Sequence, residues 1–339
     1  MNEVTKIDGI GSSVRRTEDK KFLTGKGKYT DDINRPGQVQ AYFLRSDVAH
    51  AKIKKIDTKN AQSAPGVVGV FTGDDIAADK VGGPICGWVV PCRDGSATKE
   101  PPHPLLAQGK VRFVGDAIAV VLAETAEQAK SGAELIDVDY EELSPVVDFE
   151  NAGDGAQIHD EVPNNCYFDW ELGDEKATAD ALSGAKKIVK LRVRNNRLVP
   201  NAMEPRCALA EFDNLDDSYT LHTTSQNPHL TRLVLAAFMF AIPESKLRVI
   251  APDVGGGFGS KIYVYIEEAV CVWASKKVGR PVKWTADRTQ AFLTDCHGRD
   301  HVNDVQLGLD ENNKIVGLRV DTVCNLSLIH ISEPTRRWS

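Results

Sequence analysis

The sequence contains no C-x-x-C pair, and its cysteines lie far apart. There are seven of them: Cys86, Cys92, Cys166, Cys207, Cys271, Cys296 and Cys324. This spacing argues against a zinc ribbon, a thioredoxin-like site and an iron–sulfur cluster bound by this chain, because each needs clustered thiolates. An odd number of scattered cysteines is typical of reduced thiols in a cytosolic protein. We therefore expect a cytoplasmic location.

Long apolar runs are also missing. The longest, LVLAAFMFAI at residues 233–242, is half the length of a membrane span and predicts a buried helix. The N-terminal region has no apolar stretch of the kind found in signal peptides. Arg15 and Arg16 are followed by charged residues, so we reject a twin-arginine signal. We expect no membrane span.

The chain has no excess of positive charge. Its formal net charge is −7, and no basic stripe stands out, so nucleic acid is not an expected partner. The chain is 42% hydrophobic and 26% charged, which is the ordinary composition of a soluble globular protein. Its length of 339 residues is enough for about two domains.

The elements we expect indicate an α/β or α+β fold in two units, and of these we predict α+β. Thr125 with Gln128 three residues later predicts the start of a helix at 125–136. In the first unit we expect strands at 39–46, 51–58, 66–73, 114–124 and 137–143. A polar, glycine-bearing segment then predicts a linker, and the second unit follows. There we expect strands at 186–196, 208–213, 218–225, 246–252, 281–288 and 315–325, and helices at 227–241 and 262–279.

A glycine-rich loop, DVGGGFGSK at 253–261, lies between an expected strand and an expected helix. Four of the five residues at 255–259 are glycine, and the fifth is Phe258. The loop matches neither the dinucleotide fingerprint nor the Walker A pattern, although its position favours an anion-binding role. A tight turn would need only one or two glycines. We interpret Gly256, Gly257 and Gly259 as backbone lying against a bulky ligand, with Phe258 as a wall.

Two further stretches carry candidate site residues. In TTSQNPH (223–229), Gln226 lies at a strand-to-helix junction, where its amide can contact a ligand or cap the helix. In the run Met-Glu-Pro-Arg, Glu204 and Arg206 form either an internal ion pair at a bend or the wall of a pocket. His222 and His229 lack metal-ligand spacing, and we predict no direct metal ligand.

Together these stretches resemble the large, molybdopterin-binding subunit of the xanthine dehydrogenase/aldehyde oxidase family, which includes aerobic carbon monoxide dehydrogenases. The resemblance runs from residue 8 to about 325. It rests on the stretches 9–33, 112–148, 201–213, 223–229 and 250–261. It implies an α/β-hammerhead domain at 1–150, a linker at 151–176 and the first part of a molybdopterin-binding domain at 177–325.

The resemblance also implies a cofactor and a reaction. The cofactor is molybdenum–molybdopterin cytosine dinucleotide, with Gln226, Gly256, Gly257, Phe258 and Gly259 beside the metal's oxygen ligands. The reaction is oxidative hydroxylation of an aldehyde, an N-heterocycle or carbon monoxide, with water as the oxygen source. Electrons would pass to a [2Fe–2S] small subunit and an FAD medium subunit, in a dimer of heterotrimers. Glu204 and Arg206 match positions on the substrate side in some members.

The family's catalytic glutamate and its substrate-discriminating loop have no match in these residues, so we name no catalytic residue and expect this chain alone to be inactive. The ending LSLIHISEPTRRWS (326–339) does not continue the family pattern, and we interpret it as a non-native tail. Two alternatives remain: a non-enzymatic nucleotide-binding module that uses the glycine loop, and a degenerate scaffold subunit.

Overall fold

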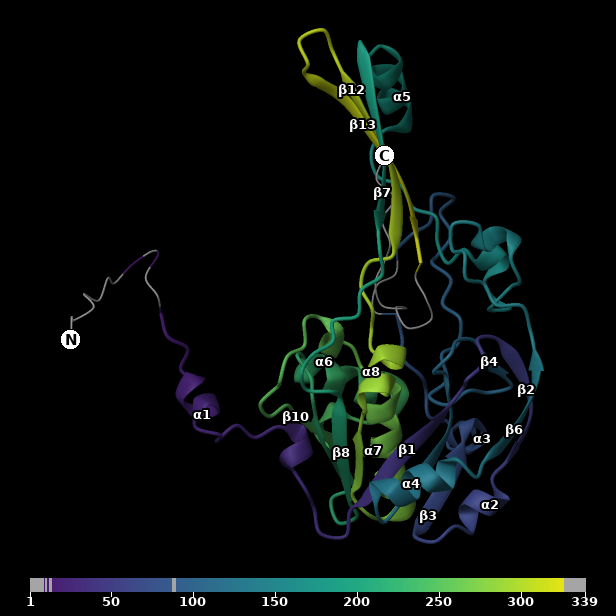
Figure 1. Ribbon diagram of the computed structural model, residues 1–339, viewed down its shortest axis with the longest axis vertical. Helices are drawn as coiled ribbons and strands as arrows, with labels where there is room; N and C mark the ends of the chain where they lie inside the picture. The colour runs from purple at the N-terminus through teal and green to yellow at the C-terminus, as the bar shows by residue number, and fades with distance from the viewer. Residues whose placement is uncertain (1–8, 10, 12–13, 87–89, 326–339) are drawn as a thin grey trace.

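The computed structural model describes residues 9, 11, 14–86 and 90–325, so the interpretation of 326–339 lies outside the described residues. The ribbon shows a broad lower body and a narrower upper part, in which a small sheet and a helix extend away from the body (Figure 1). The N-terminal segment with α1 (Asp19–Leu23) runs to one side of the body (Figure 1).

The lower body is built on one sheet to which both halves of the sequence contribute. Its strands follow the order β10 (Leu247–Ile250), β9 (Ser218–Thr223), β8 (Cys207–Asp213), β11 (Val282–Thr285), β1 (Val39–Arg45), β5 (Ala117–Ala123) and β3 (Val67–Thr72). The halves join where β1 pairs with β11 in parallel, with Val39 opposite Val282. The two predicted domains therefore share a continuous sheet, and their exact bounds stay a prediction.

Helices cover both faces of this sheet. In β5 every residue is buried, as a continuous apolar strand between two layers requires. Val121 of β5 faces α4 (Ala126–Ala133), whereas Val120 and Leu122 belong to the main core with α7 (Ile266–Val278). Thr125 accepts a hydrogen bond from the Gln128 amide, which confirms the predicted start of α4. Shorter helices complete the body: α2 (Lys59–Gln62), α3 (Gly73–Ala78), α6 (Pro228–Leu233) and α8 (Arg288–Thr294).

Two three-stranded sheets flank the body. One has the order β4 (Lys110–Val111), β2 (Ala51–Asp57) and β6 (Asp137–Glu142). The other, which extends upward in Figure 1, has the order β13 (Ile315–Cys324), β12 (His301–Leu309) and β7 (Lys187–Asn195). The helix α5 (Glu175–Ser183) packs on one face of this upper sheet, where Gly308 and Gly317 leave room for Leu182.

The structure corrects several expected elements. The predicted strand 281–288 ends at Thr285, because Asp287 caps α8 by accepting a hydrogen bond from the Gln290 amide. The helix predicted at 227–241 is present as α6 over Pro228–Leu233, but it continues as a π-helical turn, η4, at Val234–Met239 and ends there. The helix predicted at 262–279 begins at Ile266, preceded by a short 3₁₀ turn, η6 (Ser260–Ile262). Sequence patterns did not predict β12 or α5.

Short 3₁₀ turns occur elsewhere, including in the segment that we predicted as a linker. They are η1 (Thr30–Asp32), η2 (Ala152–Asp154), η3 (Pro163–Asn165) and η5 (Glu244–Lys246). Within the described ranges, no helix has the length and apolar character needed to cross a bilayer.

Candidate functional site

The glycine-rich loop connects β10 to η6 and takes up backbone conformations that favour glycine. Gly256 and Gly259 have φ angles of 97° and 91°, in the left-handed region where a side chain is strained. Phe258 also has a positive φ, 52°, and it is 75% exposed. An apolar ring held in a strained conformation in solvent is more consistent with a ligand contact than with packing.

The other two loop glycines meet a different demand, the close approach of side chains. A Cβ atom on Gly257 would lie 2.4 Å from Oε1 of Gln226, and one on Gly255 would lie 2.5 Å from Cβ of Glu204. Neither position has room for an alanine unless the neighbouring side chain moves. The loop thus depends on Gln226 and Glu204 lying directly against its backbone.

These two side chains hold the loop at both ends. Oε1 of Gln226 accepts hydrogen bonds from the amides of Gly259 (3.0 Å) and Lys261 (3.3 Å). At the other end, Oε2 of Glu204 accepts from the amide of Gly255 (2.7 Å), and the Glu204 amide donates to the Gly255 carbonyl (3.1 Å). Gln226 therefore contacts the loop through its amide oxygen, which points at the loop's own amides, and its contact with a ligand stays a prediction.

Between these anchors lie three consecutive backbone amides that have no hydrogen-bond acceptor among the described residues. No described residue accepts a hydrogen bond from the N–H groups of Gly256, Gly257 or Phe258. Successive amides in alternating backbone conformations form a concave donor site for anions or oxo ligands. The residues present thus fit a ligand that offers oxygen acceptors at this loop.

Lys261, directly after the loop, is almost completely buried. Its side chain is 1% exposed, and Nζ lies 2.8 Å from the Glu204 carbonyl oxygen and 3.1 Å from Glu204 Oε2. Burial lowers the pKa of this ammonium group, and the neighbouring Glu204 charge opposes that shift. Oε1 of Glu204 is buried and has no partner among the described residues.

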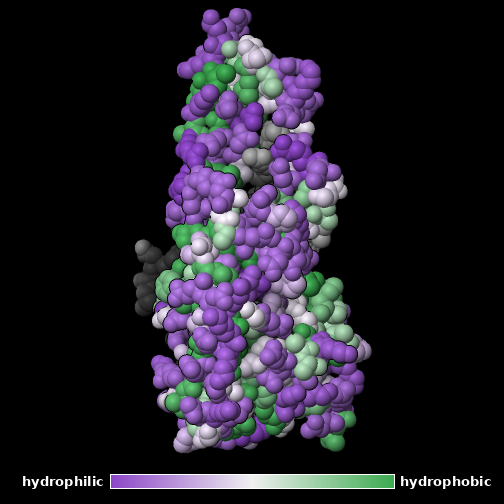
Figure 2. Space-filling model, turned by 90° about the vertical axis from the view of Figure 1, so that its right-hand side faces the viewer, coloured by the Kyte–Doolittle hydropathy of each residue, from purple (hydrophilic) through white to green (hydrophobic). Residues whose placement is uncertain are grey.

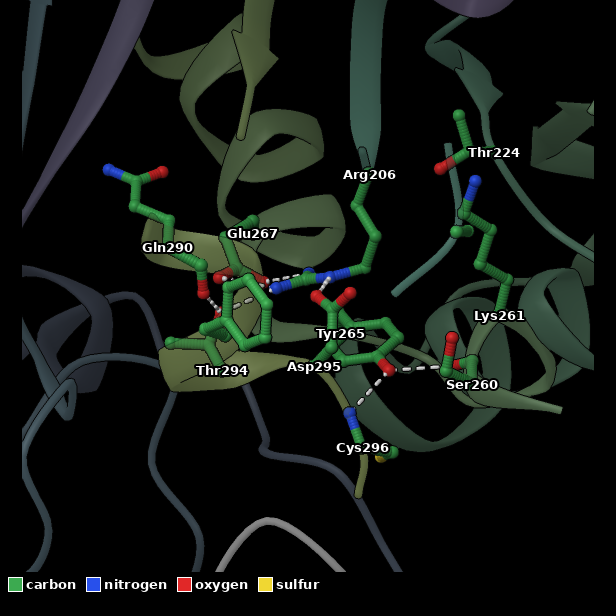
Figure 3. Close-up of polar contacts among 12 residues, drawn as sticks. Arg206, Thr224, Ser260, Lys261, Tyr265, Glu267, Gln290, Thr294, Asp295 and Cys296 are labelled. Atoms are coloured by element: carbon green, nitrogen blue, oxygen red, sulfur yellow. Dashed lines mark hydrogen bonds and ion pairs between the residues drawn. The ribbon is translucent and has the colours of Figure 1, made fainter. Parts of the chain in front are cut away.

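Arg206 lies in a buried ionic network (Figure 3). Its guanidinium donates to Glu267 (2.7 Å) and Asp295 (2.6 Å), and it lies 3.7 Å from the centre of the Tyr265 ring. Arg45 pairs with Glu267 from the other side (2.6 Å). Burial alone would raise the pKa of Glu267, but the two arginines lower it to about 2.

Tyr265 joins this network to the loop. Its hydroxyl donates to the Ser260 carbonyl (2.6 Å) and accepts from the Cys296 amide (2.9 Å), as Figure 3 shows. The end of the loop is therefore bonded to buried charged and aromatic groups, which belong to the start of α7 and to the segment after α8.

The structure gathers most of the predicted site residues in one place. Gln226, Glu204 and the loop residues Gly256, Gly257, Phe258 and Gly259 surround the free amides. Arg206 does not pair with Glu204; it faces the interior and pairs with Glu267 and Asp295. His222 is buried against Arg35, and in the described ranges no three His, Cys, Asp or Glu residues are grouped as a metal site.

The sequence patterns did not mark Lys261 or Tyr265 as site residues. A lysine after a glycine loop is usually exposed, and only a buried carboxylate partner marks it as special. For Tyr265, the available signal was Glu268 three residues later, since its carboxylate accepts from the Tyr265 amide and caps α7.

Two protein-family models match the chain. One, described as "Aldehyde oxidase and xanthine dehydrogenase, a/b hammerhead domain", covers residues 24–144. The other, described as "Molybdopterin cofactor-binding domain", covers residues 158–335, which is more than half of the chain.

Individual proteins give the same result. The chain is 33% identical over 96% of its length to the nicotine 6-hydroxylase large subunit of Paenarthrobacter nicotinovorans, and 32% identical over 98% to the carbon monoxide dehydrogenase large chain of Afipia carboxidovorans. It covers 39% and 41% of those two proteins. Quinoline 2-oxidoreductase from Pseudomonas putida superposes with a TM-score of 0.81 at 34% identity, over 92% of this chain and 39% of that one.

Proposed function

Because the chain belongs to the aldehyde oxidase and xanthine dehydrogenase family, we propose that it forms part of a molybdenum hydroxylase large subunit. The observation that supports this function most directly is the row of free amides at Gly256, Gly257 and Phe258, held open by Gln226 and Glu204. The chain spans about 40% of the length of the curated relatives it matches, so the reaction of the whole protein is part of the proposal.

The loop amides and Phe258 each have a proposed role that follows from their position. The free amides would donate hydrogen bonds to oxygen atoms of the bound group, and fixed donors of this kind stabilise negative charge that develops there. The exposed ring of Phe258 would cover one side of the ligand. The bound molybdenum–molybdopterin group would supply the oxidation of the substrate, with water as the oxygen source.

The finer features belong to the same proposal. The cofactor is the cytosine dinucleotide form, and electrons leave through a [2Fe–2S] subunit and an FAD subunit, in a cytoplasmic dimer of heterotrimers. The substrate class comprises carbon monoxide, aldehydes and N-heterocycles. Carbon monoxide and the N-heterocycles nicotine and quinoline occur in the names of the similar proteins.

The test measures molybdenum and CMP in the chain purified from a host that makes the cytosine dinucleotide cofactor. We expect molybdenum and CMP in equal amounts in the wild type. In Gly257→Ala we expect the amount of bound molybdenum and CMP to fall at least about tenfold, because the added Cβ displaces Gln226. Gly298→Ala is the control, since its Cβ meets no atom within 4 Å. Bound nucleotide without metal would instead support a nucleotide-binding module, and undiminished molybdenum in Gly257→Ala would contradict the proposed site.

A further inference from the structure

Lys261 forms a buried ion pair with Glu204, and this pair spans the glycine loop. Gly255 begins the loop and donates its amide hydrogen to Glu204 Oε2; Lys261 follows the loop and reaches the same oxygen with its ammonium group. One carboxylate oxygen thus binds both ends of a seven-residue segment. Lys261 Nζ adds a second bond to the Glu204 carbonyl.

We propose that Glu204 and Lys261 are positioning residues, which hold the loop in the conformation that leaves the amides of Gly256, Gly257 and Phe258 free. This inference rests on the proposed function for its purpose, since it concerns where the cofactor's oxygen ligands would find their donors. Its physical content concerns the loop alone.

Stability alone does not account for such a pair. Removing a lysine and a carboxylate from water costs several kcal/mol per ion, and a pair of apolar residues of similar volume is often as stable. Here the side chain of Lys261 is 1% exposed and that of Glu204 is 11% exposed, so the desolvation is nearly complete. The benefit of the charged pair lies in direction, because each donor and acceptor is fixed relative to the loop backbone.

The neighbouring contacts show why this direction matters. Gln226 fixes the amides of Gly259 and Lys261, but it makes no bond to Gly255 or Gly256. Without Glu204 and Lys261, no side chain would fix the first half of the loop, and its glycines could adopt other backbone conformations at little cost. The amides of Gly256 and Gly257 could then rotate toward acceptors in the loop or toward water.

Three variants test this in the full 339-residue chain without cofactor. They are Lys261→Met, Glu204→Gln and the double variant, each labelled with ¹⁵N-glycine. The readouts are amide hydrogen exchange over residues 255–261, the amide chemical shifts of Gly256 and Gly257, and the unfolding temperature. The matched control is Lys283→Met, because Lys283 is also a buried lysine but donates to Asp31 and Ile33, far along the chain from the loop.

We expect Lys261→Met to speed exchange over 255–261 by at least about tenfold and to shift both glycine signals, and Glu204→Gln to have a smaller effect in the same direction. The double variant should be no worse than Lys261→Met, because the two side chains act as a unit. Lys283→Met should lower the unfolding temperature and leave the loop signals in place.

Unchanged loop exchange and shifts in both single variants would overturn the proposal, as would an equal loop response in Lys283→Met. If Lys261→Met does not fold, Glu204→Gln decides, because it keeps the volume and one acceptor. The measurement needs no cofactor, so it separates from the molybdenum test: a rigid loop without molybdenum would contradict only the proposed function, and bound molybdenum with an unaffected loop would contradict only the positioning role.

Discussion

At the level of single residues, the loop glycines respond to two different constraints. Gly256 and Gly259 have positive φ angles, whereas Gly255 and Gly257 give space to Glu204 and Gln226. A turn that needed only backbone flexibility would not place side chains 2.4–2.5 Å from the missing Cβ positions. Gly255 and Gly257 are the positions where side chains from other segments contact the loop backbone. Substitutions at these two glycines should therefore affect ligand binding most.

A second residue-level feature is Glu268, buried at the start of α7. Its carboxylate accepts hydrogen bonds from the Thr223 hydroxyl and the Tyr265 amide, and burial raises its pKa to about 6. A carboxyl group whose pKa is higher in the folded state favours folding when protonated. This contribution is complete below about pH 4.5, the unfolded value, and it is lost as the pH rises through about 6.

Glu268→Gln should therefore remove this pH dependence. Glutamine resembles the protonated acid, since its oxygen can accept from Tyr265 while its nitrogen donates to Thr223. We expect the stability of the variant relative to wild type to rise by about 2 kcal/mol between pH 4 and pH 8, as urea unfolding at several pH values would show. Asp116, with a pKa also raised to about 6 by burial, affects both proteins equally. A constant difference across this range would refute the assignment.

At the level of elements, sequence patterns predicted what depends on local chemistry. The apolar strand β5, the capped helix α4 and the loop between β10 and α7 were all visible, because alternation, capping residues and glycine clusters are local signals. The strand β12 was missed because it alternates weakly, and it is stabilised by pairing with β7 and β13, which lie far away in sequence. The Arg206 network was missed for the same reason.

The junction at Tyr265 offers the clearest test at this level. Its hydroxyl bridges Ser260, at the end of the loop, and Cys296, after α8, and both partners are buried. Tyr265→Phe keeps the ring against Arg206 but removes the hydroxyl that bonds the buried Ser260 carbonyl and the buried Cys296 amide. We expect a loss of about 1–3 kcal/mol in the free energy of unfolding, measured by chemical denaturation.

The same variant should also speed amide exchange over 255–261, because the loop loses its attachment to the segment after α8. The control is Tyr219→Phe, on β9. If Tyr265→Phe matched this control in stability and in loop exchange, the hydroxyl would not connect the elements as we infer.

At the level of the whole molecule, the shared sheet explains why the site lies where the two halves meet. The first half contributes Arg45 to the buried ionic network around Glu267. The second half contributes Arg206, Glu267 and the glycine loop. The sequence alone predicts two separate domains here, because no local pattern reveals that β1 pairs with β11 across more than 200 residues. This ionic network therefore forms only when both halves of the chain have assembled.

The upper sheet has one apolar face that the described residues leave open. The pairing of its strands places Val189, Leu191, Val193 and Leu318 on the face opposite α5, where they are 40–60% exposed. Figure 2 shows apolar residues among hydrophilic ones at this end of the molecule. Contiguous apolar surface of this kind promotes association.

We therefore expect the 339-residue chain to self-associate with rising concentration through this face. Leu191→Glu places a charge at its centre, and it should shift the weight-average mass measured by light scattering toward the monomer, because burying an unpaired carboxylate is unfavourable. Lys190→Glu is the matched control: it lies on the same strand but on the α5 side, so it should leave the association unchanged. Equal effects of the two substitutions would mean that net charge, rather than the apolar face, governs association.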